Sequence, residues 1–178
     1  MPSSRDFGVL LVRVGVGATL AAHGGQKLFG WFNGPGLERA GDLFDSMGFH
    51  PGRQNAMAAG AAEIGSGVLL AAGLATPAAG AAAAGTMVVA SAVHGPNGFF
   101  AQNGGYEYSA ILGLTAVGIA LAGPGRVSLD HATRDVVNRP WMKVLALAAV
   151  VPASVYVVTQ RNRALLQHGL EDPVGTDD

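Results

Sequence analysis

Long apolar segments separated by short connections recur along the chain, and they constrain its fold more than any other feature. Five of them stand out, at 7–29, 54–74, 77–93, 106–122 and 141–159. Each is close to the ~20 residues that a helix needs to cross the hydrocarbon core of a bilayer. Because lipid offers the backbone no hydrogen-bond partner, a spanning segment of this kind has to be helical. The pattern predicts an all-α integral membrane protein.

The short connections predict how these helices pack. The first four segments are expected to form an antiparallel four-helix bundle. The fifth has no charge between Lys143 and Arg161, so we expect a peripheral C-terminal hydrophobic helix that faces lipid or forms oligomers. Pro152 should bend it, because proline removes a backbone donor. The chain then divides into a membrane core over 1–130 and a region over 131–178 with a cytoplasmic connector, the fifth helix and a disordered polar tail.

The connection between the first two segments is too long and too regular to be a simple turn. Its apolar residues recur at helical spacing with charged residues between them: Leu37, Ala40, Phe44 and Met47. This predicts an amphipathic interfacial helix in the first loop, lying on the membrane face and stopped at Gly48. If the helices alternate in direction, the turn-rich connection at 95–105 lies at the same face.

The composition agrees with a membrane setting and excludes several functions. Charged residues make up 13% of the chain, against ~25% in a typical soluble domain. A net charge of −1 argues against a nucleic-acid partner. The chain has no cysteine, which excludes disulfides, thiol chemistry and Cys-ligated metals. The lipid bilayer is the expected partner, and no metal site is predicted.

The distribution of basic residues gives a weak indication of orientation. The side of the N-terminus has six Lys and Arg residues, namely Arg5, Arg13, Arg126, Arg134, Arg139 and Lys143. The other side has five, namely Lys27, Arg39, Arg53, Arg161 and Arg163. Because basic residues favour the cytoplasm, this bias predicts a cytoplasmic N-terminus.

Ionisable residues within the apolar segments are the candidate functional groups. His23 and Lys27 are four residues apart and share one helix face with Arg13. Glu63 lies near mid-depth of the second segment on a face of small residues. A charge at this depth costs about 2.5–3.5 kcal/mol, so these groups should point at one another inside the bundle. We predict that Glu63 is the centre of a buried network, with Arg13 as its counter-ion and His23 as its nearer pocket partner.

Other polar residues cluster at the membrane face that holds the two longer connections. His94 ends the third segment, and Tyr106 and Glu107 open the fourth. Together with the first-segment cations they predict a polar pocket near that face. A structural interpretation stays open beside this one: Glu63 can be paired only to fix helix register, His94 can bind the 95–105 connection, and the tyrosines can be interface anchors.

An ordered set of short motifs identifies a resemblance. The stretch His23-Gly24-Gly25-Gln26-Lys27-Leu28-Phe29-Gly30 resembles the signature near the start of DoxX-family membrane proteins. Further motifs follow in the family's order, and they are Ser46-Met47-Gly48-Phe49, Ala62-Glu63-Ile64-Gly65-Ser66-Gly67, His94 with Asn97-Gly98-Phe99-Phe100, Gly104-Gly105-Tyr106-Glu107-Tyr108 and Gly123-Pro124-Gly125-Arg126. The likeness runs from about Phe7 to Asp130, and the fifth segment has no place in the four-helix family core.

The resemblance implies a bacterial plasma-membrane protein linked to quinone-coupled redox or oxidative and thiol stress chemistry. The resemblance identifies no catalytic residue, so we assign the site residues from the chemistry of their side chains. We assign Glu63 and His23 to proton exchange, and quinone binding to Lys27, His94, Glu107, Arg13 and Tyr106.

Two other readings stay open. The family's association with a superoxide dismutase and a sulfurtransferase allows a non-catalytic scaffold that docks soluble redox enzymes. A b-type haem between His23 and His94 would fit a bundle, but no further signature supports it.

Overall fold

The computed structural model describes residues 1–171, and side chains up to residue 167. This part of the chain forms seven α-helices and no β-strand, which confirms the all-α prediction. The helices are α1 (Ser4–Phe29), α2 (Gly36–Ser46), α3 (Gly52–Ala72), α4 (Thr76–His94), α5 (Glu107–Ala122), α6 (Leu129–Ala132) and α7 (Pro140–Glu171). Short 3₁₀ turns occupy Trp31–Asn33, Gly95–Asn97 and Ala101–Asn103.

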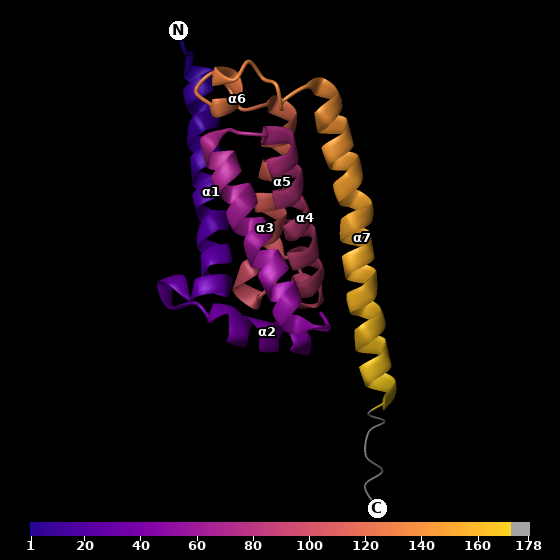
Figure 1. The fold of residues 1–178 in the computed structure, drawn as a ribbon. Coiled ribbons are helices and arrows are strands. Elements are labelled where there is room, and N and C mark those ends of the chain that lie inside the picture. The colour runs from indigo at the N-terminus through magenta and orange to yellow at the C-terminus, as the bar shows by residue number, and fades with distance from the viewer. Residues whose placement is uncertain (172–178) are drawn as a thin grey trace, which may run out of the picture.

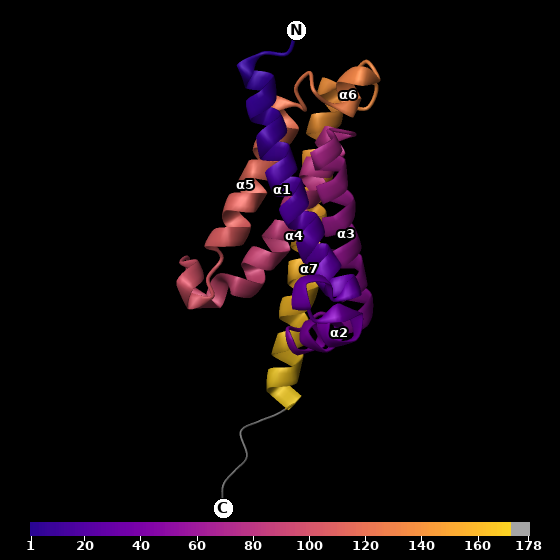
Figure 2. The same ribbon diagram turned by 90° about the vertical axis from the view of Figure 1, so that its left-hand side faces the viewer.

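The helices pack as a bundle of four with one helix outside it. Helix α3 packs against α1 and α4, and α5 packs against α4 and, less extensively, α1. Helix α7 runs beside α4 on the outside (Figures 1 and 2). The N-terminus and α6 lie at one end of the bundle, whereas α2 lies across the opposite end (Figure 1). This is the end at which the sequence predicted an amphipathic helix.

Helices α1 and α3 meet through glycines that leave no room for a side chain. A Cβ atom on Gly17 would collide with the carbonyl oxygen of Gly67, and one on Gly24 would lie 2.5 Å from that of Gly60. The two glycines of each helix are seven residues apart, so both pairs fall on one stripe. Close backbone approach through small residues is a common way for membrane helices to associate. These contacts fix the register between α1 and α3.

Within the described part of the chain, four helices are long and apolar enough to cross a membrane: α1, α3, α4 and α7. Helix α5 is apolar but shorter, with 16 residues. The side chains buried in the bundle are mostly small, whereas large apolar ones such as Leu11, Leu114 and Val144 are about 70% exposed. A molecule that is apolar on its outside is suited to contact with lipid. The chain is therefore a multi-pass membrane protein.

Helix α7 is peripheral, as predicted, because only 6% of the residues in its most apolar stretch are buried. It continues through Pro152 as one α-helix. The predicted end at Thr159 is wrong, since the helix runs to Glu171. The residues after Thr159 are good helix formers, and the next proline is Pro173. The disordered tail predicted there is thus helical up to Glu171, and its remainder lies outside the described residues.

Candidate functional site

A mostly apolar cavity lies between α3, α4 and α7, at the end of the bundle covered by α2. Its volume is about 460 Å³. Its walls are apolar and mostly small, and the aromatic rings of Phe44 and Phe49 lie at its α2 side. The polar side chains that line it are Lys27, Asn55, Glu63, Thr86, His94 and Ser154. Three residues of the predicted site therefore meet here: Lys27, Glu63 and His94.

A buried ion pair forms part of the cavity wall. The ammonium of Lys27 donates to both carboxylate oxygens of Glu63, at 2.7 and 3.0 Å. The Glu63 side chain is 7% exposed and that of Lys27 is 23% exposed. The predicted pairing of Glu63 with Arg13 and His23 is wrong, because Lys27 is its partner. Glu63 does pair with a cation of the first helix, but Lys27 is the one side chain that binds its carboxylate among the described residues, so it is not the centre of a larger network.

The error has a physical cause in the register of α1 and α3. The prediction of Arg13 as the partner assumed that the C-terminal end of the first apolar segment and the N-terminal end of the second lie at the same depth in the membrane. Instead the first turns of α3 extend beyond α1 and pack on α2, where Gly41 lies against Arg53 and Gly52 lies against Gly41. Because Gly24 faces Gly60 and Gly17 faces Gly67, Lys27 lies about one helical turn from the level of Glu63, whereas Arg13 is level with the last turn of α3. Lys27 is then the cation within reach.

Arg13 lies in a second polar cluster, at the opposite end of the bundle. It is fully buried and donates to the carbonyl oxygens of Leu70, Ala71 and Val127, at 3.2, 3.3 and 2.6 Å. The first two carbonyls belong to the last turn of α3, where a cation stabilises the negative end of the helix dipole. Arg13 therefore holds the α3–α4 turn against the 123–128 segment and does not contact Glu63.

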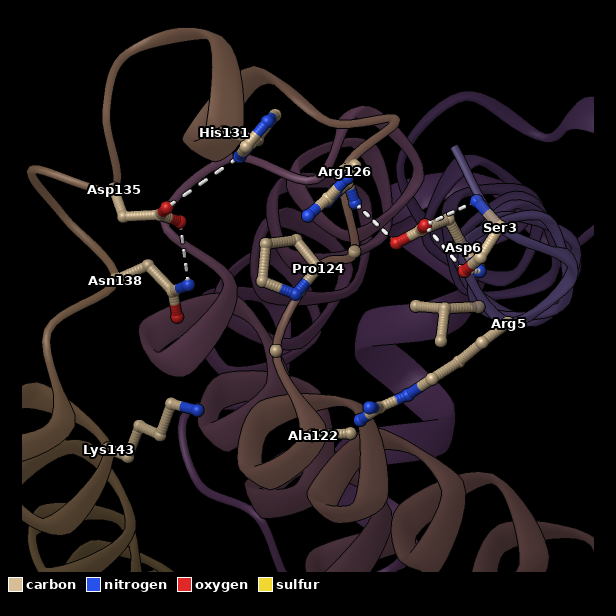
Figure 3. Close-up of a pocket in the computed structure, with 13 residues that line it drawn as sticks. Ser3, Arg5, Asp6, Ala122, Pro124, Arg126, His131, Asp135, Asn138 and Lys143 are labelled. Carbon is tan, nitrogen blue, oxygen red and sulfur yellow. Dashed lines mark hydrogen bonds and ion pairs between the residues drawn. The ribbon is translucent and has the colours of Figure 1, made fainter. Parts of the chain in front are cut away.

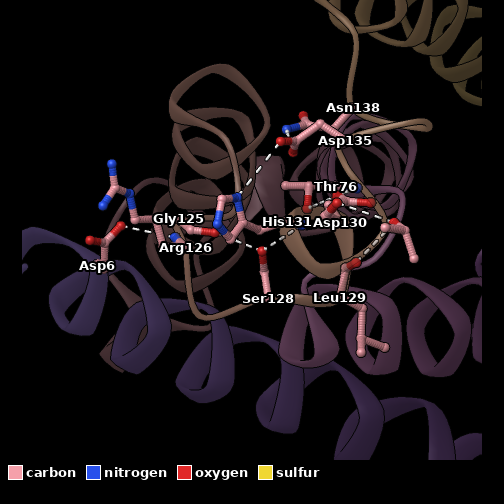
Figure 4. A network of polar contacts seen from close by, with 11 residues as sticks. Asp6, Thr76, Gly125, Arg126, Ser128, Leu129, Asp130, His131, Asp135 and Asn138 are labelled. Atoms are coloured by element: carbon pink, nitrogen blue, oxygen red, sulfur yellow. Dashed lines mark hydrogen bonds and ion pairs between the residues drawn. The ribbon is translucent and has the colours of Figure 1, made fainter. Parts of the chain in front are cut away.

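Asp130 completes this second cluster by capping α4 (Figure 4). Its carboxylate accepts from the backbone N–H groups of Ala75 and Thr76, at 2.8 and 3.0 Å, and from the Thr76 hydroxyl at 2.7 Å. Asp130 does not cap the short helix α6 in which it lies. Ser128 caps α6 instead, accepting from the N–H of His131. Asp130 satisfies donors that the α4 N-terminus leaves unpaired.

The remaining predicted site residues do not line the cavity. The Nε2 atom of His23 lies 3.3 Å from the hydroxyl oxygen of Tyr108, so this histidine joins α1 to α5. Glu107 accepts from the N–H of Ala101 at 3.0 Å, and Tyr106 packs edge-to-face on Phe99. These two residues stabilise the connection between α4 and α5. His94 does so as well, because its Nδ1 lies 2.9 Å from the Gly104 carbonyl oxygen, while the residue still reaches the cavity.

Sequence reasoning missed three polar residues of the cavity, namely Asn55, Thr86 and Ser154. Asn55 donates to the Pro51 carbonyl at 2.9 Å and Thr86 to the Ala83 carbonyl at 2.8 Å. Ser154 of α7 is 6% exposed, and no hydrogen bond of its hydroxyl occurs among the described residues. The signal for Ser154 was its place as an isolated polar residue in the fifth apolar segment. The hydroxyl lies on the cavity wall, where it is available to a bound ligand.

The arrangement can bind a flat, mostly apolar molecule that carries hydrogen-bond acceptors. Lys27 can donate a hydrogen bond and hold negative charge, and Glu63 can exchange a proton with it or with a ligand. The Ser154 hydroxyl comes from a different helix and offers a further donor. Among the described residues, no three His, Asp or Glu side chains gather as metal ligands would.

A comparison with known families agrees with the motifs. The model of the DoxX family matches residues 8–96, half of the chain. This segment holds α1 to α4, including the Lys27–Glu63 pair and most of the cavity wall, whereas α5 and α7 lie outside it. No curated protein and no solved structure matches the chain. The chain belongs to the DoxX family.

Proposed function

We propose that this protein is a membrane subunit that binds the head group of a quinone in the cavity between α3, α4 and α7. The observation that supports it is a buried ion pair in the wall of an apolar cavity at membrane depth. Ligand sites of ~300–1,000 Å³ are typically apolar with a few polar groups that orient the ligand. Ionisable groups within membrane segments commonly mark a path for a ligand, ion or proton.

The polar residues fit a quinone, whose head group is flat and has two carbonyl oxygens on opposite edges. Lys27 would donate to one of them, and Ser154 would donate to the other from the opposite wall. When bound, a quinone supplies two-electron chemistry that consumes protons on reduction. Nothing in the sequence marks a flavin or haem site, so electrons would come from a reduced substrate or a partner protein.

Glu63 and Lys27 would have distinct tasks in such a site. The Lys27 ammonium stabilises negative charge on a ligand oxygen, because the surrounding apolar wall strengthens the interaction. Glu63 holds the ammonium in place and can pass a proton through it. His94, at the mouth of the cavity, is placed to exchange protons with the aqueous side. The proposal gives no ligand contact to His23, Arg13, Tyr106 or Glu107, which stabilise the fold around the site.

Quinone affinity of the full chain in nanodiscs tests this proposal. We expect Lys27→Met to weaken the binding of a short-chain ubiquinone analogue by about tenfold or more, because a charge-assisted hydrogen bond contributes about 1.5–3 kcal/mol. Ser154→Ala removes a neutral hydrogen bond and should weaken binding about 2–10-fold.

His23→Ala is the matched control, since it changes a residue one turn from Lys27 on the same helix without touching the cavity. If the wild type, Lys27→Met and Ser154→Ala bound the quinone with equal affinity, this cavity would not be the quinone site. An effect of His23→Ala as large as that of Lys27→Met would point to the α1–α5 face instead.

A further inference from the structure

A polar groove lies at the end of the bundle opposite the cavity (Figure 3). It has a volume of about 510 Å³ and lies between the first turn of α1, the C-terminal end of α5, the 123–126 segment and the start of α7. Arg5, Arg126 and Lys143 reach it from three different parts of the chain (Figure 3). Because the groove lies at the ends of membrane helices, it is at the depth of lipid headgroups.

The three cations of the groove have no carboxylate partner among the described residues. Arg126 donates to the Met1 carbonyl at 3.3 Å, and Lys143 donates to the Leu121 carbonyl at 2.8 Å. Both acceptors are neutral, so these contacts leave the positive charges uncompensated. Like charges held together destabilise one another unless an anion joins them.

The two carboxylates of the groove are already engaged by other donors. Asp6 accepts from the N–H and hydroxyl of Ser3, both at 2.7 Å, and from the N–H of Arg126 at 2.9 Å. Asp135 accepts from the side-chain amide of Asn138 at 3.0 Å and lies 3.9 Å from His131 Nδ1. Figure 3 shows both carboxylates at the loop side of the groove. They position the loop, and of the two only Asp6 also attracts one of the three cations, Arg126.

One buried acceptor in the groove also has no partner. The Oδ1 atom of Asn138 is buried without a hydrogen bond, whereas its Nδ2 is bound to Asp135. A Cβ atom on Gly123 would lie 3.6 Å from Lys143 Nζ and 3.7 Å from Asn138 Nδ2, so these two side chains are neighbours. The groove thus offers cations for an anionic group and, next to them, an acceptor for a hydroxyl.

Apolar side chains beside the groove face the surrounding lipid. Leu121 is 56% exposed, Trp141 is 58% exposed and Val144 is 68% exposed. Tryptophan is enriched at membrane interfaces, and basic pockets between membrane helices bind acidic headgroups. We propose that the groove binds one anionic glycerophospholipid, with its phosphodiester on Arg5, Arg126 and Lys143, a headgroup hydroxyl on Asn138 Oδ1, and its acyl chains along the apolar surface.

Lipid binding to the full chain, measured by native mass spectrometry from detergent, tests this proposal. We expect phosphatidylglycerol to bind about tenfold or more tightly than phosphatidylcholine with the same acyl chains, because charge-assisted hydrogen bonds favour the anionic headgroup. The double variant Arg5→Gln/Arg126→Gln should reduce the phosphatidylglycerol affinity to the phosphatidylcholine level. Asn138→Ala should lower affinity for phosphatidylglycerol and leave that for phosphatidic acid, which lacks the headgroup hydroxyl, unchanged.

A charge-matched control is available at the other end of the molecule. Arg39→Gln/Arg163→Gln removes two positive charges outside the groove and should leave the affinity for phosphatidylglycerol unchanged. Three results would overturn the proposal: equal binding of the two lipids, an equal loss in the control variant, or displacement of the lipid by millimolar inorganic phosphate. The last result would show a site for a free anion.

Discussion

Glu63 carries a large electrostatic cost, because its carboxylate is nearly buried in a membrane segment. Its compensation comes from one residue, Lys27, which donates to both oxygens. Bringing two charges out of water costs about as much as their attraction returns, so such a pair adds little net stability. Losing one partner is far more harmful, because the remaining charge is buried alone.

A double-mutant cycle separates these two effects. We expect Glu63→Leu and Lys27→Met each to lower the free energy of unfolding by about 3–5 kcal/mol, because each leaves an uncompensated charge. The double variant Lys27→Met/Glu63→Leu should lose much less than the two single losses together, since no charge remains. Glu63→Gln keeps a polar group beside Lys27, so it should lower the free energy of unfolding less than Glu63→Leu does.

Unfolding of the purified protein in mixed micelles, followed by circular dichroism, gives these energies. Additive losses in the cycle would mean that the two side chains are not coupled, contrary to the geometry.

The partner of Glu63 could be predicted only as a cation of the first helix. The pattern of charges in apolar segments showed that Glu63, Lys27 and Arg13 had to point inward. The choice between the two cations depended on the register of α1 and α3, which the contacts of Gly24 with Gly60 determine. The sequence shows that small residues are present, but it does not show which glycine of one helix faces which glycine of the other.

At the scale of the helices, α7 is the element whose role differs most from its prediction. It is peripheral, yet Val150, Ala153 and Ser154 form one wall of the cavity. It is held at one end by Lys143 on Leu121 and at the other by Arg161 on the Met47 carbonyl, at 3.0 Å. Because the family match ends at residue 96, this wall is supplied by a part of the chain outside the matched segment.

Truncation after Arg139, which removes α7, tests whether this helix is needed for folding or only for ligand binding. We expect the shortened protein to insert and to keep its protease resistance, because α7 packs mainly on α4. It should lose quinone affinity about tenfold or more, since the cavity becomes an open surface and Ser154 is removed. Limited proteolysis in nanodiscs and a binding titration measure the two properties. A truncated protein that binds quinone as the full chain does would exclude α7 from the site.

Helix positions were the most predictable part of the fold. The predicted segments 7–29, 54–74, 77–93 and 106–122 differ from α1, α3, α4 and α5 by a few residues at each end, because apolar length is set by the bilayer. Long-range caps were not predictable. Asp130 caps α4 from 54 residues away, and only the folded chain brings it there.

The whole molecule has two ends with different chemistry. At the α2 end, an apolar cavity holds the Lys27–Glu63 pair. At the α6 end, cations without carboxylate partners line a groove, and Arg13 with Asp130 holds the turn between α3 and α4. The predicted single pocket combined residues that the structure distributes over the cavity, the α1–α5 face and this second end.

The location of a bound quinone tests the central claim most directly. The measurement is photolabelling of the full chain in nanodiscs with an azido-quinone, followed by peptide mapping. We expect adducts on cavity-lining residues of α3, α4 and α7, within 55–63, 82–94 and 150–157, and their loss when unlabelled quinone competes. Adducts around His23 and Tyr108, or labelling that unlabelled quinone does not reduce, would contradict the assignment of this cavity as the quinone site.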